Sequence, residues 1–175
     1  MQGLLPSNRP PIAKLDIAWR YVAATDDEAI GGDSYDVLPL DGNDVVAFVI
    51  GNVVEHGLGA AAAMGEMRHA MRAFLSDSRS PAEVRNRMNR LASRTPGAYA
   101  TAASLVLDRR NATIAWAIAG HLPPMVKRGT TVLSLAAPRG EPLGVADVAY
   151  ADGAMTLEDS DIVLLYTDSL VQRRR

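Results

Sequence analysis

Acidic and amide side chains recur at the ends of apolar segments, and their chemistry suits a hard cation. Asp33 follows a glycine pair in residues 31–36 (GGDSYD), Asn52 follows one apolar segment and Asp168 follows another. Carboxylate and amide oxygens are the ligands that Mg²⁺ and Mn²⁺ prefer. These positions can hold a cation only if the fold brings them together, which their spacing in sequence does not establish.

Residues 51–57 (GNVVEHG) lie between an apolar segment and the start of a helical pattern. Polar groups at such a junction tend to face a cleft, because a helix N-terminus leaves backbone N–H groups open to a ligand. Glu55 has two interpretations here. It is either a substitute ligand for the same cation or a charge that is favourable beside the positive end of the helix dipole.

Nucleotide binding is a competing interpretation of the same stretch. Residues 57–62 (GLGAAA) match the pattern G-x-G-x-x-A, follow a strand and open a helix, and Asp77 lies further along. In a dinucleotide-binding unit, however, the acidic residue follows a second parallel strand. Asp77 instead falls at the end of the expected helix and another helix follows, so close packing of small residues against a sheet explains the pattern better.

Length and composition narrow the class of protein. The chain has 175 residues, 48% hydrophobic residues, no cysteine and a formal net charge of −2, which indicates one ordinary soluble domain. This charge argues against a strongly basic face for nucleic acid, and a zinc site built on cysteine is excluded. No apolar run is long enough for a membrane span and no signal-peptide pattern opens the chain, so we expect a cytoplasmic protein.

Turn residues divide the chain into a linker, strands, a helix pair and further strands. Residues 1–14 carry Pro6, Pro10 and Pro11 and are expected to form a Pro-rich linker, with the folded domain at residues 15–175. Strands are predicted at residues 15–23, 35–40 and 44–50, with a hairpin turn at 41–43, and then at 100–107, 113–119, 125–127, 131–135, 154–157 and 162–166.

Two consecutive helices are predicted between these groups of strands. Apolar residues at helical spacing extend from Ala60 to about Ser76. Ser80 begins the second helix as the capping residue, with Pro81 at its first position and Glu83 completing a capping box. Its buried stripe is expected to be Val84, Met88, Leu91 and Ala92, and its solvated face Arg85, Arg87, Arg90 and Arg94.

Strands, a helix pair and more strands predict an α+β fold with largely antiparallel pairing in two packed sheets. One feature is unusual, because residues 161–170 form one of the most apolar strands and the sequence ends soon after it. Such a strand is buried on both faces in most folds. We therefore expect a cover that this sequence does not supply: a further part of the domain, or pairing between two copies as a homodimer.

The motifs and their order resemble those of the bacterial SpoIIE-type, PPM-family serine/threonine phosphatases. The resemblance runs from residue 4 to the last residue and rests on residues 31–36 (GGDSYD), 51–58 (GNVVEHGL), 99–101 (YAT), 119–121 (AGH), 142–144 (PLG) and 166–168 (YTD). It implies the PPM-phosphatase-like α-β-β-α sandwich, in which two antiparallel sheets are flanked by helices. This fold agrees with the elements predicted above.

The resemblance also implies an activity, the hydrolysis of phosphoserine or phosphothreonine by a water that bridges two Mn²⁺ or Mg²⁺ ions. Asp33 and Asp168 would be the catalytic metal ligands, position 52 would supply another ligand and the carbonyl of Val53 would assist. The implied substrate is a phosphorylated regulator protein similar to an anti-anti-sigma factor, in a partner-switching pathway of sigma-factor regulation.

Departures from the family pattern bear on this activity. Asn52 stands where the family has an aspartate, Glu55 and Ser169 stand where it has glycines, and nothing after Asp168 supplies the family's C-terminal helix, strand and further aspartate. A charge about 4 Å from a cation is worth at most about 4 kcal/mol at an effective dielectric of 20, so Asn52 is expected to weaken metal binding. The alternative function is a catalytically weak or inactive pseudophosphatase that acts as a protein-binding regulatory module.

The remaining polar residues of the motifs have structural interpretations. His121 lies beside Pro123 and Pro124 and is expected to order a loop, whereas His69 is expected to face solvent. Asp36 is expected to order its strand through backbone hydrogen bonds rather than to bind a metal directly.

Overall fold

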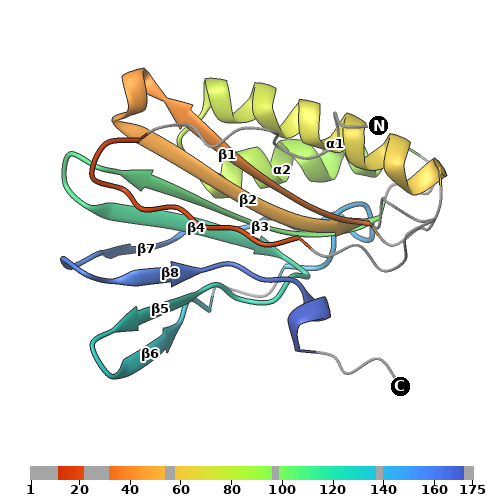
Figure 1. Ribbon diagram of the computed structural model, residues 1–175. Helices are drawn as coiled ribbons and strands as arrows, with labels where there is room; N and C mark the ends of the chain where they lie inside the picture. The colour runs from red at the N-terminus through yellow and green to blue at the C-terminus, as the bar shows by residue number, and fades with distance from the viewer. Residues whose placement is uncertain (1–11, 22–31, 54–57, 96–98, 137–139, 172–175) are drawn as a thin grey trace.

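The computed structural model of the protein describes residues 12–21, 32–53, 58–95, 99–136 and 140–171. In these residues two antiparallel sheets pack against each other, and a pair of helices covers the outer face of the larger sheet (Figure 1). This arrangement confirms the predicted α+β sandwich of two antiparallel sheets. None of the helices described is long and apolar enough to cross a bilayer.

The larger sheet has the strand order β1-β2-β3-β4-β7 and the smaller sheet has the order β6-β5-β8. The strands are β1 (Asp33–Leu40), β2 (Val45–Val53), β3 (Ala100–Asp108), β4 (Thr113–Ala119), β5 (Met125–Arg128), β6 (Thr131–Ser134), β7 (Gly153–Thr156) and β8 (Ile162–Leu164). The helices are α1 (Leu58–Asp77) and α2 (Pro81–Ala92), with short 3₁₀ turns η1 (Asp41–Asn43) and η2 (Asp168–Leu170). Because α2 directly follows α1 and Asp77 ends α1, the parallel strand that dinucleotide binding requires is absent at this point.

Local chemistry explains two of the connections. The hairpin between β1 and β2 turns through Asp41, Gly42 and Asn43, whose φ angles of 47°, 63° and 77° suit these residue types. Helix α2 begins after Ser80, whose hydroxyl accepts a hydrogen bond of 3.0 Å from the Glu83 amide. The reciprocal half of the predicted capping box is not made, because the Glu83 carboxylate accepts instead from the Ser78 hydroxyl at 2.6 Å.

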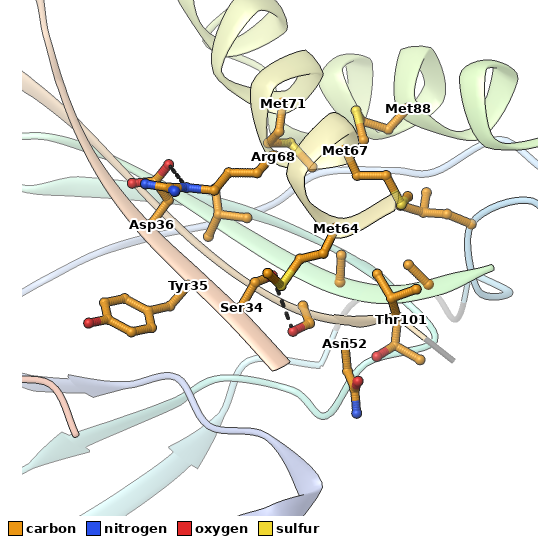
Figure 2. A pocket seen from close by; sticks show the side chains of 16 residues that line it. Ser34, Tyr35, Asp36, Asn52, Met64, Met67, Arg68, Met71, Met88 and Thr101 are labelled. Atoms are coloured by element: carbon orange, nitrogen blue, oxygen red, sulfur yellow. Dashed lines mark hydrogen bonds and ion pairs between the residues drawn. The ribbon is translucent and has the colours of Figure 1, made fainter. Parts of the chain in front are cut away.

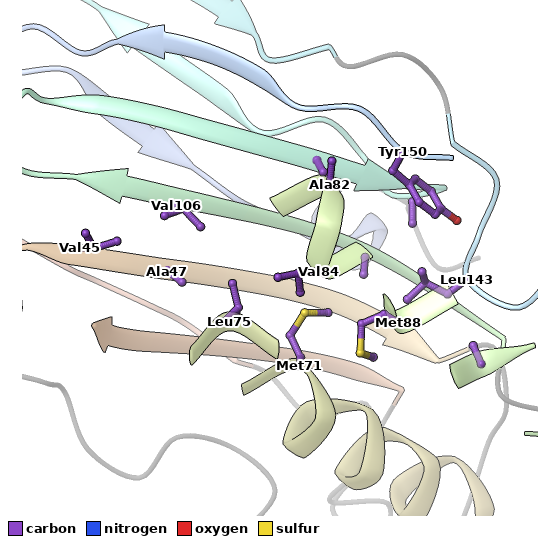
Figure 3. Packing of buried hydrophobic residues seen from close by; sticks show 14 residues of the cluster. Val45, Ala47, Met71, Leu75, Ala82, Val84, Met88, Val106, Leu143 and Tyr150 are labelled. Carbon is purple, nitrogen blue, oxygen red and sulfur yellow. The ribbon is translucent and has the colours of Figure 1, made fainter. Parts of the chain in front are cut away.

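Alternation along the strands separates two cores. Val45 and Ala47 of β2 belong to the core beneath the helices (Figure 3), whereas Phe48 and Ile50 pack on the core between the sheets. Side chains of one strand alternate between faces, so Asn52 of β2 lies on the face that is turned toward the smaller sheet. This alternation places the candidate cation ligand Asn52 between the two sheets rather than under the helices.

The strand predicted at residues 15–23 is wrong for its described part, because residues 12–21 pair with no strand. The segment instead packs on the completed sheets: Leu15 contacts the core between them, and the rings of Trp19 and Tyr35 lie 5.8 Å apart. Arg109 also donates a hydrogen bond to the carbonyl of Ala13. In this segment Ile12 is therefore buried, and Leu15 and Trp19 are half-buried, without ladder pairing.

We expected β8 to need a cover that this sequence does not supply, and the described residues leave two of its side chains exposed. Ile162 and Leu164 are 58% and 45% exposed, and among the described strands β8 pairs only with β5, at the edge of the smaller sheet. Val163 between them packs on the core between the sheets. In the described residues, β8 is an edge strand with one buried face.

Helix α2 differs from its predicted pattern at two residues. Arg85, expected on a solvated face, is fully buried, and Leu91, expected in the buried stripe, is 38% exposed. The Arg85 guanidinium donates to the hydroxyl of Ser104 on β3 at 2.6 Å, while its Nε and Nη1 have no hydrogen-bond partner among the described residues. Burial lowers the pKa of Arg85 to about 10, because a charged form is disfavoured away from water.

Candidate functional site

Three polar residues form one row across the end of the larger sheet. Asp33 of β1 lies opposite Asn52 of β2, and Asn52 lies opposite Thr101 of β3. Directly paired residues of an antiparallel sheet point to the same face, so this row faces the smaller sheet. Two of the sequence-predicted site residues, Asp33 and Asn52, are therefore cross-strand neighbours.

The smaller sheet brings the third predicted position to the same place. After β8 the chain reaches η2, and the hydroxyls of Thr167 and Ser169 donate hydrogen bonds to Asp33 Oδ2 at 2.8 and 3.1 Å. Asp168 lies between these two residues and is half-buried. Asp33 and the segment of Asp168 thus meet across the two sheets.

His121 connects the same two sheets from the loop after β4. Its Nδ1 lies 2.9 Å from the Thr101 hydroxyl and its Nε2 lies 3.2 Å from the Tyr166 carbonyl oxygen. Because a carbonyl only accepts, Nε2 carries the proton and Nδ1 accepts from Thr101. His121 has structural contacts, as expected, but its partners lie on β3 and after β8 rather than in its own loop.

Burial lowers the pKa of His121, and the positive charge of Arg85 lowers it further. A hydrogen bond to the Tyr166 backbone and the charges of Asp33 and Asp168 act in the opposite direction. The net lowering keeps the imidazole neutral near pH 7. Asp33 and Asp168 are therefore both close enough to act electrostatically on the same ring.

Gly32 marks a narrow space in which two oxygens converge. A Cβ at this position would lie 2.2 Å from the Val53 carbonyl oxygen and 2.4 Å from Asn52 Oδ1. The Val53 amide also donates a hydrogen bond of 3.0 Å to the Gly32 carbonyl. Only a residue without a side chain leaves these oxygens accessible next to Asp33.

The donors near Gly32 fit a hard cation by type, because all of them are oxygens. They fit it poorly by charge, because Asn52 contributes a neutral amide. Among the described residues, no group of three or more His, Cys, Asp or Glu side chains could hold a metal ion. Glu55, the substitute ligand considered from the sequence, lies outside the described residues.

Asp36 lies on the opposite face of β1 and has a different role. It is 4% exposed and accepts hydrogen bonds from Arg68 Nε at 3.1 Å, Arg72 Nε at 2.6 Å and the Val37 amide at 3.0 Å. The hydrogen bonds that Arg72 donates to Asp36 raise the pKa of Arg72. Asp36 therefore fixes α1 on β1, and its partners include two arginines in addition to the backbone group that we expected.

Two further motifs position the loops around the row. Gly120, with φ 60°, leaves room for Pro142, whose Cγ would lie 2.6 Å from a Cβ at Gly120. Gly144, with φ 83°, donates its amide to the buried Asn89 of α2 at 2.9 Å. The glycines of these motifs therefore serve close packing and backbone conformation.

A small apolar cavity of about 40 Å³ lies beneath α1, on the helix side of the larger sheet (Figure 2). Met64, Met67 and Met71 of α1 and Met88 of α2 contribute to its lining. Asn52 and Thr101, at the end of the larger sheet, also contribute to the lining. The sequence identified these methionines only as the apolar face of a helix pair, because helical spacing does not distinguish a packed core from a cavity.

Comparison with known proteins agrees with this geometry. The family model of Stage II sporulation protein E (SpoIIE) matches residues 42–175. The RsbU and RsbW domains of Rv1364c from Mycobacterium tuberculosis are 32% identical over 86% of this chain and 42% of that chain, with a TM-score of 0.77.

Two further solved structures share the fold at lower identity. The phosphatase domain and a regulatory fragment of SpoIIE from Bacillus subtilis are 22% identical over 78% of this chain and 41% of that chain, with a TM-score of 0.69. RsbX in complex with magnesium is 15% identical over 81% of this chain and 68% of that chain, with a TM-score of 0.64.

The chain spans only 42% and 41% of the length of the first two of these structures. However, the family model matches most of this chain, residues 42–175. The identity to the RsbU and RsbW domain structure is 32% over 86% of this chain. Together with the two antiparallel sheets and the polar row at their junction, these matches show that the chain belongs to the SpoIIE-type family of PPM phosphatases.

Proposed function

We propose that this domain is a divalent-cation-dependent phosphatase that hydrolyses phosphoserine or phosphothreonine and binds its cation weakly. The observation that supports this most strongly is the meeting of Asp33 with residues 167–169 across the two sheets. This segment carries Asp168, so two aspartates from distant parts of the sequence lie in one region, and carboxylates are suitable groups to hold a divalent cation in a phosphatase. The neutral Asn52 beside Asp33 is the reason for the low affinity.

Each residue has a distinct part in this proposal. The Asp33 and Asp168 carboxylates, the Asn52 amide oxygen and the Val53 carbonyl would hold Mn²⁺ or Mg²⁺. A divalent cation, when bound, lowers the pKa of a water molecule and neutralises phosphoryl oxygens. Gly32, which has no side chain, leaves the Val53 and Asn52 oxygens accessible. The neutral His121 hydrogen-bonds both the Thr101 hydroxyl and the Tyr166 carbonyl, and so connects the two sheets at the site.

The substrate that we propose is a phosphorylated regulator protein similar to an anti-anti-sigma factor, in a cytoplasmic partner-switching pathway. Support comes from the similar M. tuberculosis structure, in which an RsbU domain and an RsbW domain occur together. The 32% identity to that structure makes a related protein substrate a reasonable expectation.

A second candidate function is a pseudophosphatase that binds a regulator protein without hydrolysing it. Asn52 favours this candidate, because the loss of half of an attraction of about 4 kcal/mol at 4 Å already weakens binding by more than about tenfold. The two candidates differ in whether any cation concentration produces turnover.

The test is Mn²⁺-dependent release of phosphate from a phosphoserine peptide, measured for the unaltered chain, Asn52→Asp and Asp33→Ala. We expect slow release that needs high Mn²⁺, is accelerated in Asn52→Asp and disappears in Asp33→Ala. Release only in Asn52→Asp would favour the pseudophosphatase, as a scaffold inactivated at one ligand. No release from any of the three at saturating Mn²⁺ would contradict the proposed activity.

A further inference from the structure

We propose that Thr167 and Ser169 form a hydroxyl latch on Asp33, which occupies this carboxylate in the cation-free protein and competes with the cation. The proposal rests on the proposed function, because it concerns the same site. It adds a regulating role for two residues that are not themselves proposed as ligands.

The geometry of the latch is specific to one oxygen atom. Both hydroxyls donate to Asp33 Oδ2, Thr167 at 2.8 Å and Ser169 at 3.1 Å. A carboxylate oxygen has about two lone-pair positions for hydrogen bonds. The latch therefore fills Oδ2 and leaves only Oδ1 of Asp33 open to another partner.

The conformation of η2 makes these hydroxyls available. Thr167 occupies the capping position of η2 with extended backbone angles, φ −93° and ψ 167°, yet its side chain makes no capping hydrogen bond. Threonine at such a position ordinarily accepts a bond from the backbone of its own helix. Here the hydroxyl donates instead to a carboxylate on the other sheet.

Ser169 supplies the second donor and is the residue that departs from the family pattern, in which a glycine follows the aspartate. A glycine would leave Asp33 with a single hydroxyl partner from this segment. Hydrogen bonds to an ionised acceptor are roughly twice as strong as neutral ones. A cation that coordinates through Oδ2 must therefore displace both donors, and the extra donor lowers its affinity.

The latch also has a consequence that does not involve a cation. It joins the first residue of β1, in the larger sheet, to the segment that follows β8 in the smaller sheet. Loss of a donor should therefore lower the thermal stability of the metal-free protein while it raises the affinity for the cation. A residue that merely supports the fold would not produce these opposite effects.

The experiment combines calorimetric titration with Mn²⁺ and thermal unfolding in EDTA for the unaltered chain, Ser169→Ala and Ser169→Thr. Asn52→Asp is titrated beside them as the variant expected to bind Mn²⁺ most tightly. Ser134→Ala, an exposed serine of β6, is the matched control. Removal of one charge-assisted hydrogen bond should tighten Mn²⁺ binding by about three- to tenfold in Ser169→Ala and lower its melting temperature in EDTA. Ser169→Thr, which retains the hydroxyl, and Ser134→Ala should behave as the unaltered chain does.

The titration separates failure of the latch from failure of the proposed function. Equal Mn²⁺ affinities in the unaltered chain and Ser169→Ala, or weaker binding in Ser169→Ala, would contradict the latch. They would not contradict the proposed cation site. An unchanged melting temperature of Ser169→Ala in EDTA would overturn it as well. Absence of Mn²⁺ binding in every variant, Asn52→Asp included, would overturn both proposals.

Discussion

The Thr167 hydroxyl oxygen lies 2.8 Å from Asp33 Oδ2, although 134 positions separate the two residues in the sequence. Asp33 opens an edge strand of the larger sheet, and Thr167 follows the last strand of the smaller one. Their contact exists only because the two sheets pack through the core between them. The candidate site is therefore formed by tertiary packing. A substitution that disrupts the core between the sheets should disturb the site even when every site residue is retained.

Restoring the missing charge should strengthen cation binding. In Asn52→Asp, the new carboxylate replaces an amide of nearly the same shape beside Asp33, so the fold should be retained. Even half of the ceiling of about 4 kcal/mol for one charge at 4 Å corresponds to more than about a tenfold gain in Mn²⁺ affinity, measurable by calorimetry.

The control for this change is Asn111→Asp, which adds the same charge at an exposed turn between β3 and β4. It should leave the Mn²⁺ affinity unchanged. An equal gain in both variants would show that net charge, rather than position 52, controls binding.

Asp36 should matter for stability and not for the cation. Asp36→Asn breaks the ion pairs of the buried Asp36 carboxylate with Arg68 and with Arg72, whose side chain is 45% exposed. Removal of one partner of a buried pair typically costs about 3–5 kcal/mol, and solvent screening at Arg72 lowers the expected cost to about 2–4 kcal/mol. Urea unfolding should show a loss in this range, with the Mn²⁺ affinity retained. Asp41→Asn breaks a pair in which Asp41 is 51% exposed and should change stability by at most about 1 kcal/mol.

Arg85 should be replaceable with a gain in stability. Its guanidinium is fully buried and, among the residues that the structure describes, makes one hydrogen bond, to Ser104, and has no carboxylate partner. Replacement of a buried charged group by an apolar side chain of similar size is often neutral or stabilising by about 1–4 kcal/mol. We expect Arg85→Met to raise the melting temperature and Arg85→Ala, which leaves a cavity, to lower it. A lower melting temperature in Arg85→Met would mean that the buried charge supports the fold.

Acid should weaken the smaller sheet through Asp161. Three hydrogen bonds from Arg128, at 3.0, 3.2 and 2.6 Å, and one from the Glu158 amide at 2.9 Å hold the pKa of Asp161 below its ordinary value. The contribution of this group is therefore complete above about pH 4, the ordinary carboxyl pKa. It is lost as the pH falls through the lower, folded-state pKa.

The measurement is thermal unfolding between pH 7 and acid pH for the unaltered chain and Asp161→Asn. The variant should be less stable at neutral pH, and the difference between the two proteins should shrink as the pH falls. A difference that stays constant over this range would show that Asp161 does not titrate as the geometry requires.

Features governed by local chemistry could be predicted from the sequence. The turn at residues 41–43, the Ser80 cap of α2 and the alternation of β2 to β4 all depend on residues within a few positions of one another. The order of the family motifs also predicted the sandwich of two antiparallel sheets. The failure at residues 15–23 has the opposite cause, because the partners of that segment are surfaces formed by distant strands.

The burial of Arg85 was missed because residue type outweighed spacing. The buried face of α2 includes Pro81, Arg85, Met88 and Ala92. Their spacing of three and four marks one helix face, so periodicity alone predicts that Arg85 is buried. The latch at Ser169 left no comparable signal. A serine in place of a glycine gains a role only when the packing of the two sheets places Asp33 within reach.

The most direct test of a cation between the two sheets is Mn²⁺-induced broadening of backbone amide signals in a nuclear magnetic resonance spectrum. We predict that low Mn²⁺ selectively broadens the signals of Asp33, Asn52, Thr101 and Asp168. It should spare Arg128 at the far end of β5, and the effect should disappear in Asp33→Ala. Broadening that is absent, that is centred elsewhere, or that persists unchanged in Asp33→Ala would contradict the cation site on which the proposed phosphatase activity depends.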